Sequence, residues 1–337
     1  MKKKVVVVFP GRGTYNKSEL GHLKKYHGDK KNFINSVDQF RKEQGLVEVS
    51  QLDAMDKFDP VVFNSAENAA HLIYTCALCD FYSLDPDQYE VVAMCGNSMG
   101  WYLALAASGV LDTSGAINLI HTMGDLTAKY GHGAQLIFPL VDESWKKDSS
   151  LSKILDDNVA ALDPNKNESA YISIRFGGYA VVGGSSSGIK KLMSTLPKVH
   201  ERFPFKLLGT KAFHTPLLAE VPGKAFKALG ADLFSAPQLP LIDGRGKIYY
   251  PHSTNLTELY IYTLERQVVS TYDFSKSIEV ALKEFAPDHL LLTGPGTTVG
   301  GAIGQCLVEH NWGEIDSKES FSSQQAGAEF LLSMGKK

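Results

Sequence analysis

Residues 91–107 have the sequence VVAMCGNSMGWYLALAA, which places Ser98 between two glycines where a strand is expected to meet a helix. The apolar run before the serine is typical of a buried strand, and the run after it is typical of a buried helix. Gly96 and Gly100 have the spacing of a nucleophile elbow, a sharp turn in which larger flanking side chains would collide. The helix start directs free N–H groups toward the serine, where they can hold an oxyanion. We therefore predict that Ser98 is a catalytic nucleophile.

The composition is typical of a globular protein with a substantial core. The chain has 337 residues, 44% hydrophobic and 21% charged, enough for one large domain or two unequal ones. A net charge of −3 gives no reason to expect nucleic acid or an anionic membrane as a partner. The apolar run Val5–Phe9 is too short for a signal peptide, and no run of about eighteen apolar residues occurs. We therefore expect a cytoplasmic protein that does not enter a membrane.

The four cysteines do not indicate metal or redox chemistry. Cys76 and Cys79 form a C-x-x-C pair, but the pair lies inside a predicted helix and no second pair completes a zinc site. We expect all four to be core thiols and the protein to hold no metal.

The order of predicted elements indicates two interleaved patterns. Alternating strands and helices, typical of a parallel sheet covered by helices, precede Gly131 and resume after Leu208. In this pattern we expect strands at 5–9, 91–95, 239–242 and 289–292, and helices at 36–43, 66–82, 113–129, 217–229, 256–265, 274–285 and 299–308. Between the two parts lie a strand at 135–141, a helix at 150–162, strands at 171–176 and 179–183, a helix at 187–196 and a strand at 203–208.

This second pattern is the β-α-β-β-α-β order of a split βαβ unit. We therefore predict an α/β fold with a large α/β-hydrolase-like subdomain, built around a parallel sheet, from residues 1–132 and 209–310. A small ferredoxin-like (βαββαβ) subdomain is inserted at 133–208, and residues 311–337 form a C-terminal tail to which we assign no role.

A serine nucleophile needs a base, which is most often a histidine. Of the ten histidines, His214 lies where the chain leaves the predicted small subdomain and re-enters the large one. Such a junction faces the cleft between domains, where binding sites tend to form. His214 is therefore a candidate for the base, although a lone histidine in a loop is more often simply solvated.

The loop 9-FPGRGT-14 follows the first predicted strand and allows two interpretations. Its glycines could cradle a phosphate, although the spacing lacks the full G-x-G-x-x-G fingerprint. Alternatively, the N–H of Arg12 could be a second oxyanion donor that faces the N–H of Met99, because one donor in such folds comes from the loop of another strand. We favour the second interpretation.

Five segments resemble, in order and spacing, the motifs of one enzyme family. Residues 9-FPGRG-13 resemble F-P-G-Q-G, 96-GNSMG-100 resembles G-H-S-x-G, 212-AFH-214 resembles A-F-H, Arg266-Gln267 resembles an R-Q or N-Q pair, and 294-GPG-296 resembles a late G-P-G. The family is that of the malonyl-CoA:acyl carrier protein transacylases, including the acyltransferase domains of polyketide synthases. The resemblance extends from about Val5 to Val308, nearly the whole chain.

The resemblance implies a role for each matched residue. Ser98 would be acylated by acyl-CoA, and His214 would take its proton and then activate the acceptor, the phosphopantetheine thiol of an acyl carrier protein. The main-chain carbonyl of Gln267 would orient the imidazole in place of a carboxylate. The N–H groups of Arg12 and Met99 would form the oxyanion hole. No permanently bound cofactor is implied.

The resemblance also places Gly11, Asn97, Met123, Arg175 and Phe213 around the substrate. Malonyl-selective members carry an arginine where this chain has Met123. A buried carboxylate needs a fixed partner such as a guanidinium, whereas methionine offers apolar surface. We therefore hypothesise an uncharged acyl group, such as acetyl or a longer chain. Alternatively, Arg175 supplies the missing cation from the small subdomain, and the acyl group is malonyl.

Two other functions stay open at this point. Water could attack the acyl-enzyme, which would make the protein a hydrolase that releases acyl groups from carrier proteins with the same Ser98 and His214. The chain could also be an inactive docking protein, although the joint presence of Ser98, His214 and Gln267 argues against that.

Carrier proteins are typically acidic, so a basic face is expected on the enzyme. The candidate residues, which could equally be ordinary solvated lysines, are Lys190, Lys191, Lys206 and Lys211. We expect a monomer.

Overall fold

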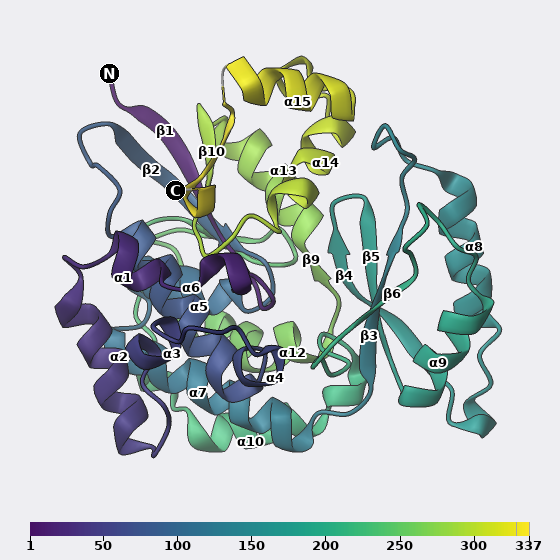
Figure 1. The fold of residues 1–337 in the computed structure, drawn as a ribbon, viewed down its shortest axis with the longest axis horizontal. Helices are drawn as coiled ribbons and strands as arrows, with labels where there is room; N and C mark the ends of the chain where they lie inside the picture. Colours follow the sequence, from purple (N-terminus) through teal and green to yellow (C-terminus); the bar gives the residue numbers. More distant parts are fainter. Residues whose placement is uncertain (328, 337) are drawn as a thin grey trace.

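Two β-sheets organise the chain in the computed structural model, which describes residues 1–327 and 329–336. In Figure 1 the larger sheet and its helices lie beside the smaller sheet, with the β9 segment between them. Each sheet has its own cluster of buried apolar side chains.

The larger sheet forms because its central strands are apolar on both faces. Val5, Val6, Val7 and Val8 are completely buried, as expected for a parallel strand covered by helices on both sides. The sheet is parallel except for its last pair. Its strands are, in spatial order, β11 (Leu331–Ser333), β10 (His289–Leu292), β1 (Lys3–Phe9), β2 (Tyr89–Gly96), β7 (Leu241–Ile242) and β8 (Ile248–Tyr249).

Helices surround this sheet, and several begin at a side chain that caps their first turn. Ser65 accepts a hydrogen bond at the start of α5, and Asp112 does so at the start of α7. The helices of this part are α1 (His22–Tyr26), α2 (Lys31–Glu43), α3 (Val49–Asp53), α4 (Pro60–Phe63), α5 (Ala66–Phe81), α6 (Gly100–Ala107), α7 (Thr113–Tyr130), α10 (Glu220–Ala228), α11 (Leu256–Ile261), α12 (Gln267–Val269), α13 (Phe274–Phe285), α14 (Gly300–Glu309) and α15 (Lys318–Gly327). Among the described residues, none of the helices combines the length and the apolar character that crossing a membrane requires.

The smaller sheet has the strand order β6-β3-β5-β4-β9. Its strands are β6 (Phe205–Leu207), β3 (Ala134–Pro139), β5 (Tyr179–Gly184), β4 (Ala170–Phe176) and β9 (Tyr272–Asp273). Each pair of neighbours among the first four strands is antiparallel, which is the arrangement expected from the β-α-β-β-α-β order. Two helices, α8 (Ser149–Ala160) and α9 (Ser186–Thr195), cover the face that points away from the larger sheet (Figure 1). The apolar side chains between helices and sheet include Leu136, Phe138, Leu155, Val182 and Leu192.

The structure differs from the sequence-based expectation at one edge of each sheet. Strand β9 lies in the range assigned to the large subdomain, where no strand was predicted, yet it pairs in parallel with β4 and so belongs to the smaller sheet. Residues 311–337 were expected to be a tail, yet their described part contains α15 and a strand, β11, which pairs with β10 at the edge of the larger sheet. The predicted helix 256–265 is also divided, because a π-helical turn at Tyr262–Arg266 follows α11.

Candidate active site

The turn between β2 and α6 is a nucleophile elbow. Ser98 has a φ of 56°, the left-handed conformation that a non-glycine residue adopts only where the surroundings hold it. A Cβ on Gly96 would collide with the backbone of Gly100, and a Cβ on Gly100 would collide with the carbonyl oxygen of Phe9. Both glycines are therefore required by close backbone packing, as predicted from the sequence.

The loop after β1 packs directly against this elbow. A Cβ on Gly11 would lie 2.8 Å from the carbonyl oxygen of Asn97, and the Asn97 N–H donates to the carbonyl of Phe9 at 3.0 Å. Arg12 and Met99 both line the cavity that contains Ser98. Among the described residues, neither of their backbone N–H groups has a hydrogen-bond acceptor. Both groups are thus available to an oxyanion near Ser98.

Ser98 and His214 meet although 116 positions separate them in the sequence. The Ser98 Oγ lies 2.6 Å from the His214 Nε2. His214 is buried, and its φ of 56° is also left-handed, so its ring direction is set by a constrained turn. This turn follows β6, at the point where the chain returns from the smaller sheet to the larger one. The pairing has the geometry of a nucleophile and its general base.

The carbonyl of Gln267 fixes the tautomer of His214. The His214 Nδ1 lies 2.5 Å from this oxygen, which can only accept, so Nδ1 carries the proton and Nε2 is free to accept from Ser98. Gln267 begins α12, which ends at Val269, so its carbonyl belongs to the last helical turn and has no partner within the helix. The negative end of a helix dipole stabilises a positively charged imidazolium. A carboxylate has this role in Ser-His-Asp triads.

Burial keeps His214 neutral. Loss of hydration lowers the pKa of His214 to about 4, because a charged ring in an apolar surrounding is disfavoured, while the Gln267 carbonyl acts in the opposite direction. At neutral pH the ring is therefore a proton acceptor.

The side chain of Gln267 ties the same helix to the elbow. Its Nε2 donates to the carbonyl oxygen of Ser98 at 3.1 Å, and its Oε1 accepts from the hydroxyl of Tyr102 at 3.1 Å. Gln267 therefore contacts the nucleophile through its side chain and the base through its main chain.

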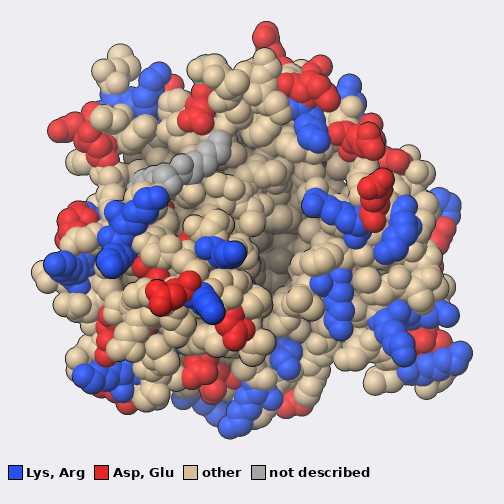
Figure 2. Space-filling view, viewed as in Figure 1, with Lys and Arg blue, Asp and Glu red and all other residues tan. Residues whose placement is uncertain are grey.

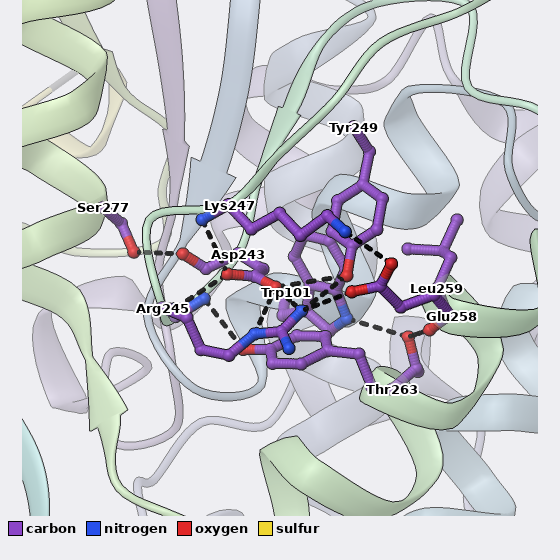
Figure 3. A network of polar contacts seen from close by, with 11 residues as sticks. Trp101, Asp243, Arg245, Lys247, Tyr249, Glu258, Leu259, Thr263 and Ser277 are labelled. Carbon is purple, nitrogen blue, oxygen red and sulfur yellow. Dashed lines mark hydrogen bonds and ion pairs between the residues drawn. The ribbon is translucent and has the colours of Figure 1, made fainter. Parts of the chain in front are cut away.

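A buried polar network, which sequence reasoning missed, holds the helix that precedes Gln267 (Figure 3). The carboxylate of Asp243 accepts from the guanidinium of Arg245 and from the hydroxyl of Tyr249. The Arg245 guanidinium lies 4.3 Å from the ring centre of Tyr262, in the π-helical turn. At the next residue of that turn, the hydroxyl of Thr263 accepts a hydrogen bond from the indole N–H of Trp101. The only trace of this network in the sequence is the short strand pair β7–β8, which is joined by a polar turn. Nothing in that pattern indicates a contact with α6.

The smaller sheet holds the other side of the site. Ser173 on β4 donates from its hydroxyl to the carbonyl of Phe213 at 2.7 Å, next to the base. Gln135 on β3 donates to the Ser173 Oγ at 2.7 Å. Tyr272 on β9 donates from its hydroxyl to the carbonyl of Gly96 at 2.5 Å, and its ring centre lies 5.4 Å from that of His214. The two sheets therefore converge on the elbow and the base.

A small apolar cavity adjoins the Ser98 hydroxyl. Its volume is about 70 Å³, and its apolar lining includes Tyr102, Ile120, Met123, Leu218 and Val268. Met123 on α7 is only 2% exposed and is one of the residues that line this cavity.

Two arginines differ from expectation. Arg175, predicted as a possible substrate ligand, lies 3.4 Å from the carboxylate of Asp273 and lines a separate groove between the smaller sheet and α13–α14. The structure therefore does not bring Arg175 to Ser98. By contrast Arg12, expected to act only through its N–H, places its side chain at the cavity, where the guanidinium lies 5.8 Å from the ring centre of Phe213.

The face shown in Figure 2 is hollowed between the two sheets, and lysine and arginine side chains lie on both sides of the hollow. Of the lysines considered for a basic face, Lys190 and Lys191 lie on α9, on the side of the smaller sheet away from the larger one. Lys206 is on β6, and Lys211 lines a groove beside Phe213. The four do not form one patch at the active site.

Comparison with known proteins gives sequence relatives at low identity. No family model matches the chain. The chain is similar to the malonyl CoA-acyl carrier protein transacylase of Synechocystis, with 22% identity over 229 residues, 68% of this chain and 71% of that protein. It is also similar to a non-reducing polyketide synthase of Trichophyton rubrum, with 28% identity over 297 residues, 82% of this chain but only 15% of the synthase. These relatives confirm the resemblance predicted from the sequence motifs.

Solved structures show the same fold. The chain superimposes on the Synechocystis malonyl-CoA:acyl carrier protein transacylase with a TM-score of 0.73 at 17% identity, covering 99% of this chain and 97% of that one. It also superimposes on a malonyl-transacylase in complex with its type II polyketide acyl carrier protein, with a TM-score of 0.73 at 18% identity, covering 90% and 93%. At these identities the likeness establishes the fold, and it confirms the predicted α/β class.

Proposed function

We propose that the protein is a serine acyltransferase that moves an acyl group from acyl-CoA to the phosphopantetheine thiol of an acyl carrier protein. The observation that carries this proposal is the hydrogen-bonded chain from Ser98 to His214 to the carbonyl of Gln267, with distances of 2.6 and 2.5 Å. The sequence relatives include an enzyme whose name states this transfer for malonyl, and one related structure holds a carrier protein.

The first half of the reaction acylates the enzyme. The Nε2 of His214 takes the Ser98 proton as the Oγ attacks the thioester carbonyl, and the C–S bond then breaks to release the CoA thiol, which receives that proton. The oxyanion that forms between these events is bound by the N–H groups of Arg12 and Met99.

The second half repeats the steps with the carrier thiol. His214 accepts the proton of the phosphopantetheine thiol, whose sulfur attacks the acyl-Ser98 ester, and the Ser98 oxygen leaves and regains the proton. Water could attack instead and release a free acid. The cavity walls beside Ser98 are mostly apolar, which supports transfer to a thiol over activation of water.

The apolar lining around Met123 supports an uncharged acyl group, at least for the part of the acyl chain that would lie against α7. A carboxylate placed there would lose its hydration without a partner from that helix.

The test is the mass of the intact protein after mixing with acetyl-, butyryl- and malonyl-CoA. We expect an acyl adduct that is absent in Ser98→Ala and that disappears when a holo acyl carrier protein is added, while the carrier gains the same mass. The matched control is Ser108→Ala, a buried serine at the end of α6.

Each other outcome has a distinct meaning. Loss of the adduct with release of free acid, and no gain by the carrier, would show a hydrolase. If no donor gives an adduct, the proposal is wrong, and the chain would be an inactive docking protein.

A further inference from the structure

Three ionisable side chains are buried together between α1 and α5, outside the cavity beside Ser98. His22 begins α1, His27 directly follows that helix, and Asp80 lies near the end of α5. His22 is 5% exposed, and the other two are completely buried. Within the described part of the chain, no other three histidine, cysteine or acidic side chains come close enough to share an ion.

The ligand atoms of the three side chains converge. The Nε2 of His27 lies 3.0 Å from the Oδ1 of Asp80, and the Nε2 of His22 lies 3.8 Å from the same oxygen. One such atom from each of the three side chains lies within 4.8 Å of the other two. Two atoms that each bind a zinc ion at about 2.1 Å in tetrahedral geometry are about 3.4 Å apart. His22 and His27 also have the H-x₃₋₅-H spacing that is common among zinc ligands.

The Nε2 of His22 is the atom that points to a ligand. It is buried, it has no hydrogen-bond partner among the described residues, and 3.8 Å is too long for a hydrogen bond to Asp80. A buried nitrogen in this state has lost its hydration without compensation, and an ion bound between the two side chains would restore a partner. The other oxygen of Asp80 accepts from the N–H of Gly294 at 2.6 Å, which orients the carboxylate as second-shell bonds do in metal sites.

We infer that His22, His27 and Asp80 bind a divalent transition metal ion, with zinc as the favoured ion. Two imidazoles and a carboxylate suit zinc, whereas Mg²⁺ and Ca²⁺ prefer oxygen ligands alone. Each ring would present its Nε2 lone pair and keep its proton on Nδ1. The ion would be structural, because its ligands are closed to solvent. The inference revises our expectation of no metal, which rested on the cysteines, and it is independent of the proposed acyl transfer.

The ion would connect α1 and α5 with the loop after β10, which Asp80 contacts at Gly294. That loop packs against the loop after β1, because a Cβ on Gly296 would lie 2.5 Å from the carbonyl oxygen of Thr14. The hydroxyl of Thr14 in turn donates to the carbonyl of Gly11 at 3.2 Å, one residue before Arg12. The metal site would therefore stabilise the support of this loop without touching a substrate.

The experiment titrates the untagged full chain, freed of metal with EDTA and dialysed, with zinc chloride in a calorimeter. We expect one zinc ion per chain, and a melting temperature a few degrees higher when free zinc is at about 100 times its Kd. Magnesium chloride at the same concentration should change neither. His22→Leu removes one ligand atom that has no hydrogen bond, so we expect zinc affinity to fall at least about tenfold while the metal-free protein stays folded.

The matched control is His121→Leu, because His121 also stacks on a second histidine, His71, but belongs to no group of three ligands among the described residues. That variant should bind zinc like the native protein. Circular dichroism checks folding, and His22→Gln replaces His22→Leu if the latter unfolds, since an amide is not a usual zinc ligand.

Three outcomes would overturn the inference. They are a native protein that does not bind one zinc ion per chain, a folded His22 variant with native zinc affinity, and equal effects of magnesium and zinc. None of these measurements depends on acylation of Ser98, so failure here would leave the proposed acyl transfer standing.

Discussion

The catalytic centre and the acyl cavity lie against each other but are built in different ways. The centre depends on the backbone: left-handed turns at Ser98 and His214, a carbonyl at Gln267 that binds His214 instead of a partner within its helix, and glycines where two main chains touch. The cavity depends on side chains from separate segments, such as Met123 on α7 and Arg12 on the loop after β1. In the proposed acyl transfer, the reaction chemistry would thus be set by backbone conformation, whereas the choice of acyl group would be set by which distant side chains meet.

The strongest test of the backbone-built centre removes the base. We expect His214→Ala to slow acylation of Ser98 by at least about 10³-fold, because the serine loses its proton acceptor while the N–H donors stay in place. Stopped reactions followed by intact mass would measure the rate. His252→Ala, which changes an exposed histidine, should leave the rate unchanged. A loss below tenfold would mean that another group serves as the base.

The next largest effect concerns the contact between the two main chains. Gly100→Ala places a methyl group against the carbonyl of Phe9, so we expect unfolding free energy to fall by about 2–4 kcal/mol. Urea unfolding followed by circular dichroism measures it. Gly301→Ala is the control, since it lies in a helix with no described atom within 4 Å of the added Cβ and should be neutral or slightly stabilising. Equal behaviour of the two variants would contradict the close packing of elbow and loop.

The pH dependence tests whether the centre stays desolvated in solution. Because burial lowers the pKa of His214 to about 4, the base is unprotonated above that value, and kcat/KM for acylation should decline only toward pH 4. A histidine with its ordinary pKa of about 6.5 would already lose about tenfold at pH 5.5. The same shift affects stability. Between pH 6.5 and 4 the unfolded chain binds a proton that the folded chain does not, so His214 lowers the unfolding free energy as the pH falls through that window. A kinetic midpoint near pH 6.5 would show a hydrated ring.

The smallest expected effect concerns the bond between the smaller sheet and the elbow. Tyr272→Phe removes the hydrogen bond to the Gly96 carbonyl, which leaves a buried acceptor unpaired, so we expect a loss of about 1–2 kcal/mol in unfolding free energy. Acylation should slow only a few-fold, because Ser98 and His214 remain. Tyr171→Phe, at an exposed position of β4, is the reference. Should both substitutions cost the same, the Tyr272 hydroxyl would have no special role.

The sequence was informative wherever a feature is local. The elbow, the two interleaved patterns and most element bounds follow from the spacing of glycines and apolar residues, and the described bounds of α5, α7 and α13 differ from the predicted ones by at most one residue. The pairing of Ser98 with His214 followed from motif resemblance and is present in the structure at hydrogen-bond distance.

Features that depend on long-range contact could not be predicted. Arg175 follows Ile174 and Arg12 lies between two glycines, and only the fold shows that the first meets Asp273 while the second lines the cavity. Strands β9 and β11 are two and three residues long, too short for a periodic pattern, and they form because a sheet edge is available. The same holds for the network around Asp243, whose members come from a strand pair and a helix.

Strand β9 has a mechanical consequence. It leaves the helix of Gln267, pairs with β4 and sends the Tyr272 hydroxyl back to the elbow, so the chain passes between the two sheets four times rather than the two that a simple insertion requires. A body held by four crossings cannot swing on a two-stranded hinge without breaking the alignment of serine and imidazole. In the proposed transfer, a carrier's prosthetic arm would therefore enter through rearranged side chains at the rim, while the walls of the crevice stay in place.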